Sequence, residues 1–161
     1  MVQRHAFWRR MASIHRTQGA RPLAHLMTRV LFVCIGNSCR SPMAEGFANY
    51  YGNHLLQASS AGSHPARVIQ PETIQVMLEA GVDISGQASK GFRDVRLEWM
   101  DWVVVLEASL AGSIPLPSRK TRQLNWSVND PIGRSMELYR AVRDEIQMKV
   151  LDFIEKIRAE G

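Results

Sequence analysis

Continuous apolar runs alternate along the chain with segments that have the spacing of a helix. The runs at residues 30–35 and 102–106 are typical of strands that are buried on both faces of a parallel sheet. Shorter segments predict two further strands, one at residues 55–60 that ends at Gly62 and one at residues 121–126. The pattern therefore predicts four strands.

Three helices are predicted between and after these strands. Pro42 suits the first turn of a helix that continues through Tyr50, because that turn does not need the missing N–H. Pro71 opens a second helix, which Gly81 ends. A third helix begins near Ser135 and keeps helical spacing at Leu138, Val142, Ile146, Val150, Phe153 and Ile157. This alternation predicts an α/β fold: a three-layer sandwich with a central, mostly parallel four-stranded sheet and helices on both faces.

The length and composition indicate one domain with a packed core. The chain has 161 residues, of which 45% are hydrophobic. It has no apolar run of about 18 residues, so we expect no membrane span. The formal net charge of +5 comes from residues 1–28, which hold five arginines and no acid. The remaining 15 basic and 15 acidic residues balance, and a neutral domain at 29–161 predicts no nucleic-acid partner.

The basic leader at residues 1–28 has three interpretations. Arg-rich segments without acids resemble organelle transit peptides. The leader can also be a disordered basic arm, or the product of an upstream start, because Met27 stands just before the first strand. In each case the catalytic domain is expected at 29–161.

Two cysteines, Cys34 and Cys39, are too few and too close to form a disulfide framework. They favour a reducing compartment, and we expect a cytoplasmic protein. Metal binding by the pair is not expected, because no His or third Cys lies nearby.

The loop after the first strand has the form Cys, five residues, Arg, Ser, from Cys34 to Ser41. Open α/β sheets place their ligand crevice at this point, between a strand and the start of a helix. Successive backbone N–H groups and the helix dipole favour an anion there, and Gly36 permits unusual backbone angles. Arg40 can make a two-pronged contact to a tetrahedral oxyanion. The residues expected to bind the substrate are Ile35, Gly36, Asn37, Ser38, Cys39 and Ser41.

Cys34 is the candidate nucleophile of this loop. A thiol that faces a helix N-terminus and a guanidinium ionises more easily, and the thiolate is the reactive form. The Ser41 hydroxyl can donate to that thiolate, and the Asn37 amide can hold the loop. The alternatives are a buried Cys that only fills space and a nucleotide P-loop. The P-loop pattern Gly-Lys-Ser/Thr is absent.

Residues 33–45 resemble the signature of the low-molecular-weight protein tyrosine phosphatase family, whose fold the thioredoxin-coupled arsenate reductases share. The resemblance covers 29–161 and includes Ser60-Ala61-Gly62, Asp83-Ile84-Ser85-Gly86, Trp102-Val103-Val104, Asp130-Pro131 and Arg143-Asp144-Glu145-Ile146. It implies the fold of these phosphatases. It also implies a phosphomonoesterase that acts on a phosphorylated protein or small aryl phosphate.

By this resemblance, Asp130 is the general acid that protonates the leaving group and then the base that activates water. The alternative for an Asp-Pro pair is a turn or a helix cap. In the resembled phosphatases, a cysteine at the position of Cys39 can form a reversible disulfide with the nucleophile. The alternative is an inert small side chain.

Two departures bear on the branch of the family. The resembled reductases relay electrons through two cysteines after the third strand, but residues 106–115 contain none. Arsenate reduction would therefore need an external thiol, a glutaredoxin-like partner, or relay through Cys39. The second departure weakens the expectation of a phosphotyrosine preference. Ile132 and Gly133 follow Asp-Pro, where eukaryotic-type phosphatases have aromatic residues. A non-catalytic oxyanion or phosphoprotein binder is the third hypothesis.

No cofactor is expected. Some resembled reductases have a carboxylate for a cation where this chain has Lys90, so we expect neither bound potassium nor bound sodium. Trp99, Trp102 and Trp126 are interpreted as packing residues.

Overall fold

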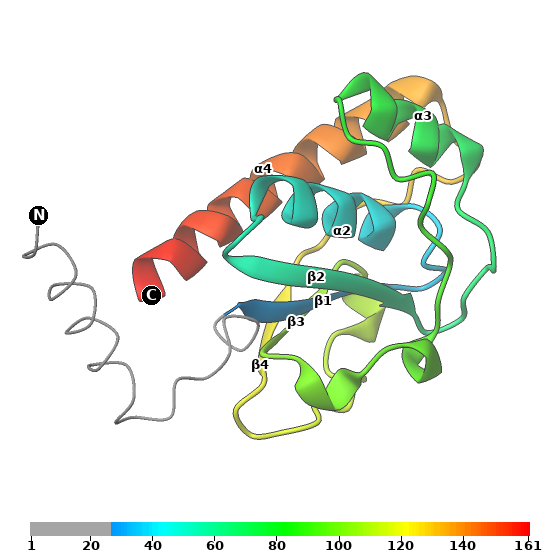
Figure 1. Cartoon of the computed structure of the whole chain (residues 1–161). Coiled ribbons are helices and arrows are strands. Elements are labelled where there is room, and N and C mark those ends of the chain that lie inside the picture. Colours follow the sequence, from blue (N-terminus) through cyan, green and yellow to red (C-terminus); the bar gives the residue numbers. More distant parts are fainter. Residues whose placement is uncertain (1–26) are drawn as a thin grey trace, which may run out of the picture.

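The computed structural model describes residues 27–161 (Figure 1). Its centre is a parallel sheet in the order β2-β1-β3-β4. The strands are β1 (Thr28–Cys34), β2 (Leu56–Gly62), β3 (Trp102–Val105) and β4 (Arg122–Asn125). Both central strands, β1 and β3, are buried along almost their whole length. The predicted α/β fold with a parallel four-stranded sheet is confirmed.

Three α-helices cover one face of the sheet: α2 (Arg40–Tyr51), α3 (Pro71–Glu79) and α4 (Met136–Glu160) (Figure 1). Their apolar sides form the larger core with alternate residues of the strands, including Val30, Phe32 and Val104. Burial of this apolar surface is the main force that holds the helices on the sheet. The packing of α2 on the sheet places the start of this helix near the carboxyl end of β1.

Short 3-10 helices and loops cover the opposite face. They are η2 (Phe92–Asp94), η3 (Leu97–Trp99) and η4 (Ala108–Leu110). The core on this side is smaller and consists of Leu31, Val33, Ala61, Val103, Val105 and Ile114, with partly buried residues of these segments against it. Within residues 27–161, helices thus lie on both faces, with the α-helices on one and short 3-10 helices on the other.

Local signals place the ends of the elements. The Ser135 hydroxyl accepts a hydrogen bond from the N–H of Leu138 at 3.3 Å and so caps the predicted third helix, which starts at Met136. Pro71 is the first residue of α3, as the sequence predicts. β1 already begins at Thr28, the last residue of the predicted leader. The rest of that leader, residues 1–26, lies outside the described residues.

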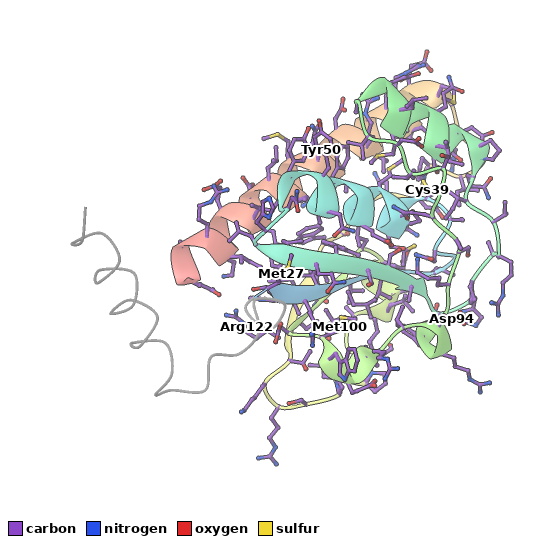
Figure 2. The ribbon with its side chains drawn as sticks, in the orientation of Figure 1. Met27, Cys39, Tyr50, Asp94, Met100 and Arg122 are labelled. Carbon is purple, nitrogen blue, oxygen red and sulfur yellow. The ribbon has the colours of Figure 1, made fainter. Side chains whose placement is uncertain are left out.

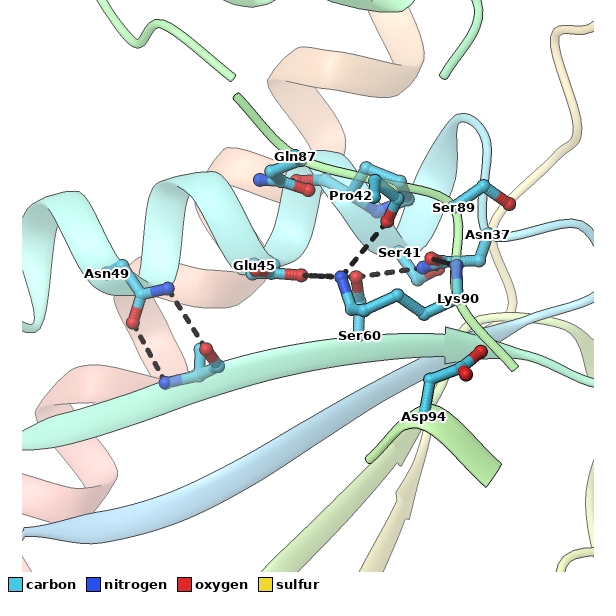
Figure 3. Close-up of polar contacts among 12 residues, drawn as sticks. Asn37, Ser41, Pro42, Glu45, Asn49, Ser60, Gln87, Ser89, Lys90 and Asp94 are labelled. Carbon is cyan, nitrogen blue, oxygen red and sulfur yellow. Dashed lines mark hydrogen bonds and ion pairs between the residues drawn. The ribbon is translucent and has the colours of Figure 1, made fainter. Parts of the chain in front are cut away.

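One edge of the sheet is closed by a side chain. The Asn49 amide donates to the carbonyl of Ala58 at 3.0 Å and accepts from its N–H at 2.9 Å, as a neighbouring strand would (Figure 3). This protects the open edge of β2 against pairing with another chain. No helix within residues 27–161 is long and apolar enough to span a membrane.

Candidate functional site

The loop after β1, residues 35–39, turns its carbonyl groups outward. The carbonyls of Cys34, Ile35, Gly36 and Ser38 accept hydrogen bonds from N–H groups of the segment 63–70, at 2.8 to 3.2 Å. Within residues 27–161, the N–H groups of the loop itself have no acceptor. Backbone donors that are free and close together form an anion-binding nest, and here the N-terminus of α2 adds to it.

The left-handed residue of this loop is Asn37, with φ of 46°, and not Gly36. The expectation that Gly36 supplies the unusual backbone angle is therefore wrong. Asn tolerates this conformation better than most side chains, and here its amide is held on both sides. Gly36 instead saves space, since a Cβ there would lie 3.3 Å from the Ser38 hydroxyl.

Gly62, at the end of β2, lets the loop approach the sheet. A Cβ at this position would lie 2.4 Å from the Ile35 carbonyl oxygen and 2.8 Å from the Asn37 nitrogen. Both contacts are impossible for real atoms, so only glycine fits without a shift of the loop backbone. The sequence signal was the Ser60-Ala61-Gly62 match, to which no role was assigned.

The candidate nucleophile lies at the end of a hydrogen-bond network. The Cys34 sulfur is 2.9 Å from the Ser41 hydroxyl. The Asn37 amide nitrogen donates to the hydroxyls of Ser41 and Ser60, at 2.9 and 2.8 Å (Figure 3). Asn37 thus holds the loop as expected, and Ser41 makes its expected contact with Cys34. Cys34 and Ser41 are buried.

Glu45 and Lys90 give this network a direction. The Ser60 hydroxyl donates to the Glu45 carboxylate, which can only accept, and the Lys90 ammonium lies 3.5 Å from the same oxygen (Figure 3). Ser60 must then accept from Asn37, whose second amide proton goes to Ser41. The Ser41 proton is left to point at the Cys34 sulfur, which stabilises a thiolate.

Arg40 is held firmly at the first turn of α2. Its Nη1 donates to Glu107 at 2.8 Å and to the Val128 carbonyl at 2.9 Å. This ion pair, with the bonds from Ser109, lowers the pKa of the Glu107 carboxyl. Sequence reasoning missed Glu107, because a single acid after β3 matches no pattern of its own. The buried guanidinium is therefore fixed in place beside the loop.

Asp130 lies beside Arg40, with its Oδ2 3.6 Å from Nη2 of the guanidinium. Its other oxygen accepts from the Ile132 N–H at 3.1 Å. The carboxylate thus makes the turn that an Asp-Pro pair commonly makes, and it also faces the candidate site. About half of its side chain is exposed, which leaves it open to substrate and water.

Cys39, the residue before α2, is a buried free thiol, as Cys34 is. Burial raises the pKa of Cys39 to about 12, an effect that the nearby Thr73 hydroxyl offsets only in part. Cys39 is therefore protonated at neutral pH. Burial raises the pKa of Tyr139, on α4, to about 12, and the nearby Cys39 adds to this shift.

Most of the predicted site residues meet in this one loop. Ser38 and Cys39 are buried with Arg40, whereas Ile35 is exposed. Among residues 27–161, no three His, Cys, Asp or Glu side chains come together as a metal site. The absence of a cofactor stays a prediction.

Residues 29–161 match the family model for low molecular weight phosphotyrosine protein phosphatases. A glutaredoxin arsenate reductase of Synechocystis sp. is 38% identical over 81% of this chain and 99% of its own length. An arsenate reductase solved in the phosphate binding state is 37% identical, with a TM-score of 0.70 over 81% of this chain and 99% of that chain.

A low molecular weight protein tyrosine phosphatase from T. tengcongensis is 33% identical, with a TM-score of 0.70 over 80% of this chain and 99% of that one. Proteins named for either activity thus match about four fifths of this chain. The match of residues 29–161, together with the loop that the structure shows, leads to one conclusion: the chain belongs to the low molecular weight phosphotyrosine protein phosphatase family.

Proposed function

We propose that this protein is a cysteine-dependent phosphomonoesterase of the protein tyrosine phosphatase type. The Cys34 thiolate attacks the phosphorus of a monoester, and an S–P bond forms as the bond to the leaving oxygen breaks. The free N–H groups of residues 35–39 and the Arg40 guanidinium stabilise the phosphoryl oxygens in the transition state. Ser41 stabilises the thiolate before attack and after release.

Asp130 completes the reaction in this proposal. Its carboxylic acid gives a proton to the leaving alkoxide or phenoxide, and its carboxylate then takes a proton from water. That water attacks the phosphorus, the S–P bond breaks, and inorganic phosphate leaves the regenerated Cys34 thiolate. The 3.6 Å separation from Arg40 supports this assignment, because it puts the carboxylate beside the phosphate-binding group.

The observation that carries the proposal is the set of cysteines. The chain has two cysteines, both at the catalytic loop. Just after β3, the chain has Glu107, which binds Arg40. No cysteine follows residue 39, so an adduct on Cys34 cannot be resolved by a relay through later cysteines. Hydrolysis through Asp130 is the route that the chain's own residues supply. The substrate is a phosphorylated protein or a small aryl phosphate, and exposed Ile35 and Ile132 offer apolar contact to it.

Arsenate reduction with an external thiol is the second candidate, favoured by the arsenate reductases among the relatives. Arsenate would lose water as it bonds to the Cys34 sulfur. An external thiol, such as glutathione, would attack that sulfur, forming a mixed disulfide and releasing arsenite as As(V) gains two electrons. A glutaredoxin would then reduce the disulfide. Cys34 is a free thiol, as this reaction requires.

One pair of assays separates the two candidates. The purified chain receives p-nitrophenyl phosphate, and separately arsenate with glutathione and glutaredoxin. Cys34→Ser serves as the control in both. We expect phosphate release that Cys34→Ser abolishes. Turnover in the arsenate assay but not with p-nitrophenyl phosphate would establish the second candidate. Phosphate binding without turnover in either assay would establish a binding protein.

Replacement of Asp130 by Asn tests its role as the acid. We expect kcat to fall by about 10² to 10³ with phenyl phosphate, because the amide cannot protonate a poor leaving group. The loss should be much smaller in the first step with p-nitrophenyl phosphate, whose phenolate leaves without help. Steady-state and burst kinetics with both esters measure this difference. Equal losses with both esters would mean that Asp130 only shapes the turn.

A further inference from the structure

A cavity of about 320 Å³ lies on the face of the sheet that the 3-10 helices cover. Asp94 and Met100, which border it, lie on the side of the sheet opposite α2 (Figure 2). The cavity contains no residue of the catalytic loop. Its walls come from the start of β1, from β2 and from the segment 90–100.

The composition of β2 explains the cavity. Residues alternate between the two faces of a strand, and Ala58 points into the core beneath the α-helices. Its neighbours Gln57 and Ser59 therefore face the other way, and both line the cavity. Covering these polar side chains with an apolar segment would cost free energy. This corner of the sheet is left hollow and polar.

The charges around the cavity are mainly positive. Three cationic side chains line it, from Arg29, Lys90 and Arg96, against one acid, Asp94. Lys90 is paired with a glutamate outside the cavity. The Asp94 carboxylate accepts from the Gly91 N–H at 2.8 Å and lies 3.8 Å from a guanidinium outside the cavity. Within residues 27–161, no carboxylate lies within 4 Å of the guanidinium of Arg29 or of Arg96. The Asp101 carboxylate is nearby but accepts from the backbone N–H of Arg29, at 2.8 Å.

Trp99 holds these two arginines together. Its ring is half exposed, and the guanidinium carbons of Arg29 and Arg96 lie 5.2 and 4.4 Å from the ring centre. Cation–π contacts use the flat side of a guanidinium and leave the N–H groups at its edge free to bind. Two such groups from different segments, beside the Ser59 and Gln57 side chains, match a multivalent anion.

We propose that this cavity is a second anion-binding site, which takes a small phosphate-bearing molecule. Its volume is at the lower end of the range of about 300 to 1,000 Å³ for small-molecule sites, which suits a compact ligand. Arg29 and Arg96 bind the phosphate groups, and Trp99 keeps the two guanidiniums in place. The site does not depend on the chemistry at Cys34.

Residue-resolved NMR on the full chain tests this proposal. Pyrophosphate is titrated at constant ionic strength while the Trp99 indole N–H and the Gly36 amide are followed separately. The indole signal is assigned with Trp99→Phe. We expect the Trp99 signal to move and saturate with its own midpoint, whatever the catalytic loop does. Citrate, a polycarboxylate of similar charge, is run in parallel and should move the Trp99 signal less.

Matched variants decide whether the cavity is responsible. Arg29→Ala with Arg96→Ala should weaken the Trp99 response at least about tenfold, equivalent to 1.4 kcal/mol, with the spectrum of the remaining domain unchanged. Arg93→Ala, in the same segment but outside the cavity, should leave it as it is. Three results would each overturn the proposal: a Trp99 signal that never saturates, the same response in the double variant as in Arg93→Ala, or a stronger response to citrate than to pyrophosphate. If the double variant unfolds, Arg96→Gln alone gives the same comparison.

Discussion

At the scale of single residues, the direction of the network that ends at Cys34 has a testable consequence. In Ser41→Ala, the sulfur has no hydroxyl donor, while the rest of the network from Glu45 to Asn37 can persist. A hydrogen bond to a charged group is worth about 1.5 to 3 kcal/mol, so iodoacetamide should alkylate Cys34 at least about tenfold more slowly at pH 6. Mass spectrometry of the Cys34 peptide measures the rate. An unchanged rate would show that Ser41 is only a packing residue.

Burial of Cys39 predicts a loss of folding stability at alkaline pH. Its pKa in the folded protein is raised from 9.0 to about 12, so the buried neutral thiol stabilises the fold fully below pH 9. That contribution is lost as the pH rises from 9 towards 12, by up to about 1.4 kcal/mol per pH unit. Urea unfolding at pH 8 and pH 10 should show a smaller loss in Cys39→Ala than in the wild type. Tyr139 shifts in the same direction, so some loss remains in both. Parallel losses would contradict the assignment to Cys39.

At the scale of elements, the packing of the loop against the end of β2 depends on Gly62. In Gly62→Ala, the added Cβ meets backbone atoms that cannot move aside. We expect a loss of stability of about 1 to 3 kcal/mol, together with loss of turnover, because the loop has to shift. Thermal unfolding and phosphate release measure both effects. Gly86→Ala is the control, since a Cβ at Gly86 meets nothing within 4 Å. Equal effects of both changes would contradict this account.

The elements were predictable where local signals coincide. The strand, loop and helix from β1 to α2 carry an apolar run, a spaced Cys and Arg, and a Pro in the first turn, and all three agree with the structure. The 3-10 helices were not predicted, because three residues show no periodicity. Within α3, the apolar side chain of Leu78 is 60% exposed, whereas that of Val76 is buried. Tertiary packing decides between such neighbours.

The site shows the same division. The loop residues follow one another in sequence, so their spacing revealed them. The partners Glu107, Ser60 and Lys90 come from three other segments and meet the loop only after the sheet has formed. No local pattern relates them to Cys34. The cavity at Trp99 likewise joins separate segments, so it was not visible in the sequence.

At the scale of the whole molecule, the residues proposed to act in catalysis all lie within the region that matches the family, residues 29–161. We expect a chain that starts at Met27 to unfold at the same temperature as the full chain and to have the same kcat/KM, since the family match covers residues 29–161. Calorimetry and phosphate release test this. A loss of more than about threefold in kcat/KM, which is roughly 0.6 kcal/mol, would assign a role to the leader.

In the proposed mechanism, Cys34 carries a phosphoryl group during turnover. Rapid acid quench of the protein mixed with excess p-nitrophenyl phosphate, followed by peptide mass spectrometry, tests it directly. We expect a phosphoryl group on the Cys34 peptide within the first turnover. There should be more of it in Asp130→Asn, where hydrolysis lacks its base, and none in Cys34→Ser. Phosphate release at the full rate with no phosphoryl group on Cys34 would contradict it.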